Sequence, residues 1–257
     1  MVWFLYKYLE VVLMLVVNGI LCENQVLNER PVIGIAAMMI TDKMHIRKLP
    51  HLDGRSYVAS SYVKYLELAG ARVIVIPPDI EIKEEKKLFD NINGLLFPGG
   101  EVNLEDSQYF QVTQRLFRFA KEANKQDNYF PVLGICRGMQ AIMVHTVGSI
   151  TPLSDTDSRN YPTTLQFYED ALKSKLMRDI PKELLVKHMK NNLTAHFHKY
   201  GITPKTFRET PIINEHFKMV ATSKDRNGIE FVSMYEGTTI KKFSFFTRIT
   251  RRFIVQQ

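Results

Sequence analysis

The positions of apolar residues along the chain predict strands that alternate with helices. Short continuous apolar runs at residues 31–36, 72–76, 94–97 and 132–135 predict four buried strands. Between them, apolar residues recur at helical spacing at residues 57–69, 81–89 and 108–124, which predicts three helices. This alternation is typical of a mostly parallel sheet covered by helices on both faces, so the predicted fold class is α/β.

Beyond residue 150 the pattern is less regular. Apolar runs at residues 165–168, 217–222 and 229–234 predict three more strands, the last preceded by an Asp-Arg-Asn-Gly turn. No internal repeat or proline-rich linker divides the 257 residues, so we expect one main domain. We expect that domain to span residues 23–237, between an N-terminal segment at residues 1–22 and a divergent basic tail at residues 238–257.

The N-terminal segment has the pattern of a secretory signal peptide. Lys7 precedes an apolar run at residues 11–21, and polar residues follow at positions 23–25. The run is shorter than the roughly 20 residues that span a bilayer, so a removable signal is favoured over a membrane anchor. The Asn-Leu-Thr sequon at residues 192–194 adds slight support for this route. We therefore expect secretion, with membrane contact only during targeting.

The formal charge of +7 is concentrated at one end. Five of the seven net charges belong to residues 241–257, which contain no acid. The body of the chain has no stripe of Lys and Arg with interleaved aromatic residues, so nucleic acid is not an expected partner.

The strongest chemical signal is Gly-Ile-Cys-Arg-Gly-Met-Gln at residues 134–140. It follows a predicted strand and precedes a predicted helix at residues 141–147, which is the order of a nucleophile elbow with cysteine in place of serine. Gly134 and Gly138 remove Cβ atoms that would clash across so sharp a turn. A buried structural cysteine does not explain these glycines, so we predict that Cys136 is a nucleophile.

Two further features bear on that prediction. The only other cysteine, Cys22, lies near the expected cleavage site, which leaves Cys136 as a free thiol in the mature chain. Pro-Gly-Gly at residues 98–100 follows a predicted strand, and its backbone N–H groups could stabilise an oxyanion together with that of Arg137. Taken alone, this second sequence is no more than an ordinary turn.

A cysteine nucleophile normally needs a histidine as its base. His145 falls within the helix after the elbow and is expected to point away from the sulfur. His196 and His198 alternate, so in an extended segment both rings lie on one face. They could belong to a metal site, but no third ligand at useful spacing is evident, so no metal is expected. The other histidines are expected on the surface or at helix ends: His45, His51, His188 and His216.

At this point the chain resembles the class I glutamine amidotransferase-like superfamily, and within it the folate γ-glutamyl hydrolases, peptidase family C26. The resemblance covers about residues 30–237. It is carried by ordered blocks at residues 30–35, 61–67, 69–73, 92–100, 127–132, 193–199 and 229–233. So many blocks in order are more specific than an elbow alone.

The resemblance implies an αβα sandwich with a mostly parallel central sheet. It implies hydrolysis of γ-glutamyl bonds in folylpoly-γ-glutamates, through a thioester, in lysosomes or vacuoles or after secretion. In this reading Cys136 is the nucleophile and the backbone N–H groups of Gly100 and Arg137 are the oxyanion donors. No cofactor is implied, and the oligomeric state stays open, with a homodimer as one candidate.

The resemblance also implies a set of substrate contacts. It maps His198 onto a histidine of the family's substrate site, where it is also a candidate substitute base. It places Tyr57, Gly99 and Gln140 among the substrate-binding residues, with Gln140 at a position where the family tends to have glutamate.

The sequence departs from the family pattern after Gly237. The family continues with a strand and then Gln-Trp-His-Pro-Glu, whose histidine is the general base and whose glutamate orients it. Here no histidine follows His216 and no acid follows Glu236. We therefore expect the base to be missing, together with the last strand and helix, and the activity to fall by several orders of magnitude.

Two explanations and three functions compete. The tail is either altered, by splicing or a frameshift, or belongs to a diverged paralogue; the first is favoured because the resemblance stops abruptly. The leading function is γ-glutamyl hydrolysis, and the second is binding of folylpolyglutamates without catalysis. A glutamine amidotransferase is motivated by Gln140 alone and is opposed by the signal peptide, because such synthases work inside the cell.

Overall fold

The structure is a computed structural model that describes residues 28–40, 56–126, 128–168, 171, 173–174, 176–237 and 245–247. Its contacts divide the chain into residues 1–30 and residues 31–257. Every described helix and strand belongs to the second unit. The expected signal peptide at residues 1–22, and the basic tail apart from residues 245–247, lie outside the described residues. No helix in the described part is long and apolar enough to cross a membrane.

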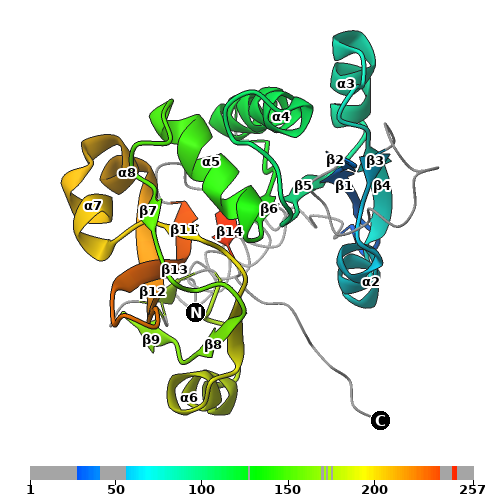
Figure 1. The fold of residues 1–257 in the computed structure, drawn as a ribbon. Coiled ribbons are helices and arrows are strands. Elements are labelled where there is room, and N and C mark those ends of the chain that lie inside the picture. The colour runs from blue at the N-terminus through cyan, green and yellow to red at the C-terminus, as the bar shows by residue number, and fades with distance from the viewer. Residues whose placement is uncertain are drawn as a thin grey trace, which may run out of the picture. The chain divides into compact units, whose positions relative to one another are not determined.

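A five-stranded parallel sheet forms the centre of the second unit (Figure 1), in the order β14-β6-β5-β1-β4. Neighbouring strands are parallel throughout. The four strands predicted from the first half of the sequence are all present. The sheet consists of β1 (Val32–Ala36), β4 (Arg72–Ile76), β5 (Gly94–Phe97), β6 (Val132–Gly134) and β14 (Phe245–Thr247).

Helices cover both faces of this sheet, because its apolar side chains alternate between two packing layers. On one face Ile35 and Leu96 pack with Leu66 of α2 (Ser60–Leu68). On the other face Leu95 and Phe97 pack against α3 (Ile82–Phe89), α4 (Gln108–Lys125) and α5 (Arg137–Val147). Figure 1 shows α2 and α3 on opposite sides of β1 and β4. The three predicted helices are therefore confirmed, and α5 begins earlier than expected, directly after the elbow.

The second half of the unit is built around an antiparallel sheet in the order β13-β12-β9, which confirms the three later strands. Around it lie short hairpin pairs and three helices that the sequence pattern did not predict. The sheet contains β9 (Gln166–Phe167), β12 (Phe217–Lys224) and β13 (Glu230–Gly237). The pairs are β2 (Met38–Met39) with β3 (Ser56–Tyr57), β7 (Ser154–Asp155) with β11 (Tyr200–Gly201), and β8 (Tyr161–Thr163) with β10 (Thr194–His196). The helices are α6 (Lys182–Lys190), α7 (Pro204–Glu209) and α8 (Pro211–His216).

One expectation about the tail was wrong. The last strand of the parallel sheet is present, because β14 pairs with β6 and places Thr247 beside Gly134. Its sequence does not match the family, but the aromatic run at residues 243–246 has high β propensity, and β6 would otherwise leave an unpaired edge. The residues after Thr247, where a covering helix was also expected to be missing, lie outside the described residues.

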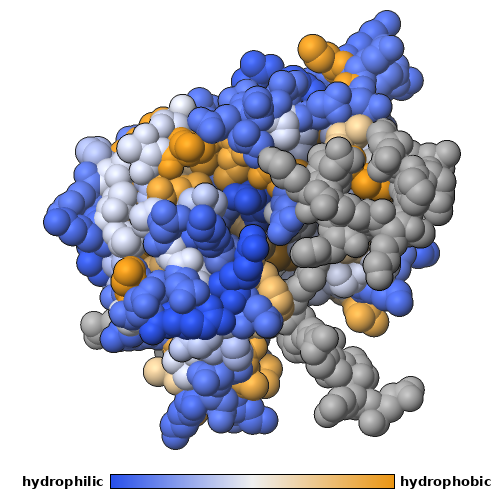
Figure 2. Space-filling model, in the orientation of Figure 1, coloured by the Kyte–Doolittle hydropathy of each residue, from blue (hydrophilic) through white to orange (hydrophobic). Residues whose placement is uncertain are grey.

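The surface is what an ordinary globular unit presents. On the face in Figure 2 most side chains are hydrophilic, and hydrophobic ones gather in only a few places. Scattered exposed apolar side chains are normal, so this surface indicates no partner.

Candidate active site

Cys136 lies in the sharp turn between β6 and α5, at the carboxyl end of a central strand. Its backbone has φ 54° and ψ −109°, a strained conformation for a residue with a Cβ. Among the described non-glycine residues only Asn160 also has a positive φ. Such strain persists only where the surroundings enforce it, and it clusters at functional sites. The predicted strand–turn–helix elbow is therefore present.

Two glycines allow the chain to approach so closely here. A Cβ at Gly138 would overlap the carbonyl oxygen of Phe97, at the end of β5. A Cβ at Gly99 would lie 2.8 Å from the Cβ of Cys136, closer than real Cβ atoms come. The loop after β5 thus packs directly against the elbow, which brings the predicted oxyanion donors to the same place as the sulfur.

Two tyrosines hold this loop from opposite faces of the sheet. The Tyr109 hydroxyl, from α4, donates to the carbonyl of Pro98 at 3.0 Å. The N–H of Gly99 donates to the hydroxyl of Tyr62, from α2, at 2.9 Å. Burial raises the pKa of Tyr109 well above its usual value, which keeps it a donor.

The two predicted oxyanion donors lie on either side of this contact. Gly100 makes no backbone hydrogen bond within the described part of the chain. Arg137 is the first residue of α5, so its N–H has no acceptor inside the helix. A Cβ at Gly100 would lie 3.2 Å from the Tyr57 hydroxyl oxygen, so Tyr57 is adjacent to the loop as the sequence suggested.

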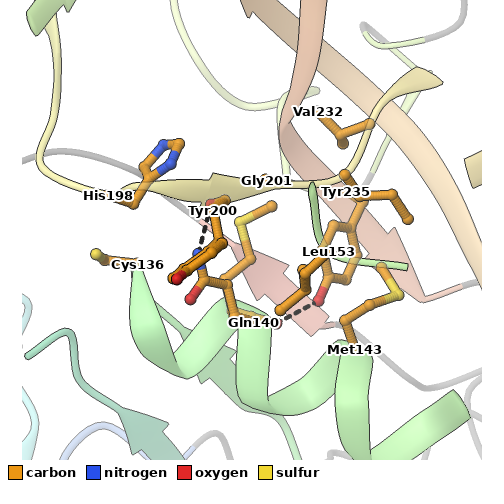
Figure 3. A pocket seen from close by; sticks show the side chains of 11 residues that line it. Cys136, Gln140, Met143, Leu153, His198, Tyr200, Gly201, Val232 and Tyr235 are labelled. Atoms are coloured by element: carbon orange, nitrogen blue, oxygen red, sulfur yellow. Dashed lines mark hydrogen bonds between the residues drawn. The ribbon is translucent and has the colours of Figure 1, made fainter. Parts of the chain in front are cut away.

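A cavity of about 20 Å³ opens beside Cys136 (Figure 3), large enough for roughly one water molecule. Cys136, Gln140 and His198 line one end of it, which brings three predicted site residues together. Met143 and Tyr235 line the apolar end.

The Gln140 side chain is held at both ends. A guanidinium N–H of Arg137 donates to Gln140 Oε1 at 2.8 Å, and Gln140 Nε2 donates to the carbonyl of Tyr200 at 2.6 Å. The amide is therefore oriented before any ligand arrives, and it links the first turn of α5 to β11.

His198 belongs to a buried chain of hydrogen bonds. Its Nδ1 lies 3.1 Å from Ser158 Oγ, and its Nε2 lies 3.3 Å from Nδ1 of His196. His196 Nε2 in turn lies 2.8 Å from Thr163 Oγ1. As predicted, the two imidazoles share one face of the segment.

The donors in this chain follow from a single hydroxyl. The Ser158 hydroxyl donates to the carbonyl of His198 at 2.8 Å, so His198 Nδ1 must be the donor toward Ser158 Oγ. His198 Nε2 then accepts from His196, and His196 Nε2 accepts from Thr163. Both rings are neutral in this arrangement, and both nitrogens of His198 are occupied.

Burial explains why these rings stay neutral. It lowers the pKa of His198 to about 4, and the positive charge of Arg137 lowers it further. Burial lowers the pKa of His196 to about 3, with a contribution from His198. The neighbouring elbow cation and the apolar surroundings thus act in the same direction.

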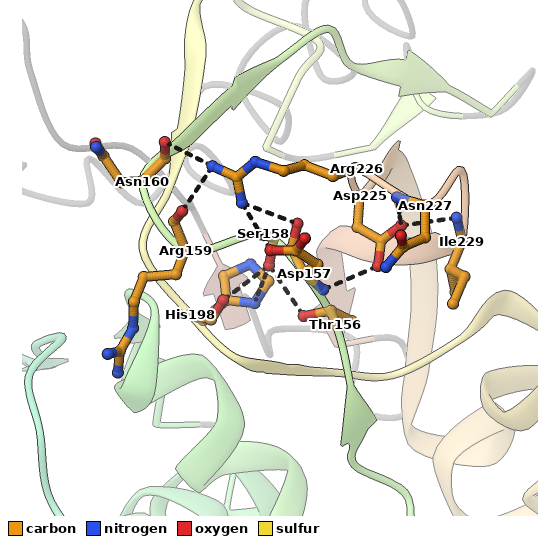
Figure 4. A network of polar contacts seen from close by, with 10 residues as sticks. All are labelled: Thr156, Asp157, Ser158, Arg159, Asn160, His198, Asp225, Arg226, Asn227 and Ile229. Atoms are coloured by element: carbon orange, nitrogen blue, oxygen red, sulfur yellow. Dashed lines mark hydrogen bonds and ion pairs between the residues drawn. The ribbon is translucent and has the colours of Figure 1, made fainter.

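A polar network fixes the loop that carries Ser158 (Figure 4). The Asp225 carboxylate accepts from the N–H of Asp157 at 2.9 Å, and Arg226 pairs with the Asp157 side chain at 2.7 Å. The sequence identified residues 225–228 only as a turn. It did not identify Ser158, because the partner of that side chain, His198, is 40 residues away.

His145 faces away from the elbow, as expected. Its Nε2 lies 3.0 Å from Thr113 Oγ1 on α4, and its ring packs on Phe110. Burial lowers its pKa to about 3, and the charge of Lys121 adds to the effect. His145 therefore stabilises the packing of α4 on α5 rather than the site.

Comparison with known sequences identifies the family. A sequence profile described as Peptidase C26 matches residues 31–241. The chain belongs to this family. A γ-glutamyl hydrolase of Mus musculus is 40% identical over 210 residues, which cover 82% of this chain and 64% of that relative. The human γ-glutamyl hydrolase is 35% identical over 209 residues, covering 81% and 64%. The chain thus spans a little under two thirds of these C26 relatives.

Solved structures confirm the fold. The glutaminase domain of Trypanosoma brucei CTPS with bound acivicin superimposes with a TM-score of 0.57 at 13% identity, covering 86% of this chain and 85% of that one. A putative GMP synthase component from Thermoplasma acidophilum gives 0.51 at 15% identity, covering 85% and 82%. This C26 chain therefore has the class I glutamine amidotransferase-like α/β fold, as the sequence predicted.

Proposed function

We propose that this chain acts on γ-glutamyl bonds of folylpoly-γ-glutamates, with Cys136 as the nucleophile. The observation that carries the proposal is the strained positive φ of Cys136 at an elbow, in a chain of the C26 family. The cavity beside it, lined by Gln140 and His198, supports a bound glutamyl group at the same place.

The proposed reaction has two steps. The Cys136 thiolate attacks the γ-carbonyl carbon, and the N–H groups of Gly100 and Arg137 donate to the oxyanion that forms. The C–N bond then breaks, the leaving amine takes up the proton released by the thiol, and a thioester remains on the sulfur. Water attacks the thioester, which frees the γ-carboxylate and returns the thiol.

We propose that this form works slowly. The sequence has no histidine after His216, and both ring nitrogens of His198 are engaged by Ser158 and His196. The thiolate then relies on the N-terminus of α5 and on the Arg137 charge rather than on a base.

The direct test is glutamate release from folylpentaglutamate by the purified chain. We expect slow release that disappears in Cys136→Ala and persists in the matched control Cys22→Ser. Equal release by Cys136→Ala and the unaltered chain would refute the assigned role of Cys136.

A second candidate is binding of folylpolyglutamates without turnover, favoured by the occupied nitrogens of His198. Titration calorimetry with folylpentaglutamate separates the two. Binding without glutamate release supports this candidate, and absence of measurable binding eliminates it.

We also propose passage through the secretory route, toward an extracellular or a lysosomal or vacuolar location. The apolar run at residues 11–21 and the sequon at Asn192, which is exposed after α6, support it. N-terminal sequencing of protein expressed in a eukaryotic cell should find a start after residue 22. An intact N-terminus on protein retained in the cytosol would contradict the proposal.

A further inference from the structure

The side chain of Arg137 is a cation without a counter-charge at the nucleophile. It follows Cys136 directly, is half-buried, and forms no ion pair with any described carboxylate. Its guanidinium uses one N–H to reach Gln140 Oε1. Because a guanidinium has five N–H donors in a planar fork, most of its donor capacity is left for a ligand.

Arg137 is aimed at the cavity by the residue it holds. Gln140 lines the cavity beside Cys136 and is itself fixed by the carbonyl of Tyr200. The charge of Arg137 also reaches His198, whose pKa it helps to lower, on the same end of the cavity. The guanidinium therefore lies beside the polar end of the site, in a partly desolvated position where charge-assisted bonds are strong.

We propose that Arg137 is a specificity-determining residue that binds a carboxylate of the substrate. This inference rests on the proposed function, because each residue of a γ-linked glutamate chain carries a free α-carboxylate on a short saturated arm from the scissile carbonyl. A guanidinium fork matches a carboxylate in two parallel hydrogen bonds, and the link to Gln140 holds the fork in place beforehand. Arg137 thus contributes its backbone N–H to the oxyanion and its side chain to recognition.

A thiol-labelling experiment tests Arg137 without requiring turnover. In a Cys22→Ser background, Cys136 is alkylated with iodoacetate, an anion, or with iodoacetamide, its neutral counterpart. The ratio of the two rates, divided by the same ratio for glutathione, reports anion recognition, since any change in thiolate fraction affects both reagents equally.

We expect this ratio to fall about tenfold in Arg137→Met and to be partly retained in Arg137→Lys. Arg159→Met, which removes a cation paired with Glu101 at 3.6 Å, serves as the matched control and should leave the ratio unchanged. An unchanged ratio in Arg137→Met, with a native circular dichroism spectrum, would overturn the inference. If Arg137→Met fails to fold, the comparison of Arg137→Lys with the unaltered chain decides, and an identical ratio there overturns it.

A substrate pair tests the same idea during turnover. γ-Glutamyl-p-nitroanilide carries the α-carboxylate, and its α-amide lacks the charge. We expect Arg137→Met to lower kcat/KM by about 100-fold for the carboxylate and by less than about threefold for the amide. Equal losses on both substrates would refute the carboxylate contact. If the unaltered chain turns over neither substrate, the proposed function fails, while the alkylation ratio still decides the role of Arg137.

Discussion

The backbone N–H of Gly99 donates a hydrogen bond to the hydroxyl of Tyr62, 2.9 Å away. This contact joins α2, on one face of the central sheet, to the loop that packs against Cys136. The loop is therefore anchored by a side chain that lies far from it in sequence, and its position depends on how α2 packs.

Replacing Tyr62 with Phe removes the acceptor and leaves the Gly99 N–H unsatisfied in a partly buried place. We expect a loss of about 1 kcal/mol in the free energy of unfolding, or about 3 °C in Tm. Thermal unfolding followed by circular dichroism measures this. Tyr65→Phe is the matched control, since Tyr65 lies on the same helix and is 39% exposed. Equal effects of the two variants would contradict the importance of this contact.

Gly138→Ala should destabilise the protein although alanine normally favours a helix. The new methyl group would overlap the carbonyl oxygen of Phe97, which belongs to a central strand and cannot move cheaply. We expect a loss of roughly 2–4 kcal/mol in urea unfolding. In Gly34→Ala the methyl group meets only the flexible ends of Ile76 and Ile92, at 2.7 and 2.8 Å, so a smaller loss is expected. The reverse order would show that the elbow has room to relax.

Stability should fall as the pH drops below about 6.5, the ordinary pKa of histidine. Burial lowers the folded pKa of His145 and His196 to about 3 and that of His198 to about 4. Between these values and 6.5 the unfolded chain binds protons that the folded chain does not. Each histidine therefore costs about 1.4 kcal/mol of stability per pH unit as the pH falls through this window.

His145→Gln isolates one of these three sites and keeps a donor for Thr113. Urea unfolding between pH 6 and pH 4.5 should then show a pH dependence shallower by about 1.4 kcal/mol per unit than in the unaltered chain. Parallel curves would mean that His145 is protonated in the folded protein.

Asp225→Ala should loosen the loop that carries Ser158. The carboxylate accepts three backbone N–H bonds, from Asp157, Asn227 and Ile229, at 2.8–2.9 Å. Leaving these donors unsatisfied should lower the free energy of unfolding by roughly 2–4 kcal/mol. Lys224→Ala, at the exposed neighbouring position, should change it by less than about 0.5 kcal/mol. A similar small effect for both would argue against the network.

Free imidazole should accelerate the reaction if a missing base limits it. At tens of millimolar and pH 7, we expect glutamate release from folylpentaglutamate to increase by roughly tenfold, because a mobile base can take the thiol proton. Cys136→Ala should gain nothing, which separates rescue from background hydrolysis. No acceleration in the unaltered chain would indicate that thiol deprotonation is not the slow step.

The sequence predicts those parts of the fold whose signal is local. The buried strands from Arg72 to Ile76 and from Gly94 to Phe97 appear with the expected bounds, because a continuous apolar run ends at a turn residue in each case. The elbow is equally local, since both of its glycines lie within two residues of Cys136.

Features set by distant partners escaped prediction. The short strands β7, β8, β10 and β11 are two or three residues long, too short to show a period, and each exists because of a partner far along the chain. The shared face of His196 and His198 follows from alternation, but the direction of their hydrogen bonds depends on Ser158 and Thr163. The prediction for β14 failed because it compared residues with a family pattern, whereas pairing with β6 requires only a β-forming run.

The place of β14 also orders events during synthesis. The strand that leads into Cys136 gains its outer neighbour only when residues 245–247 are made, more than a hundred residues after its own. Until then β6 emerges from the ribosome as an open edge, and closing so long a loop is slow. The reactive turn is thus among the last parts of the sheet to be enclosed, and a nascent chain carries its thiol on an unfinished scaffold.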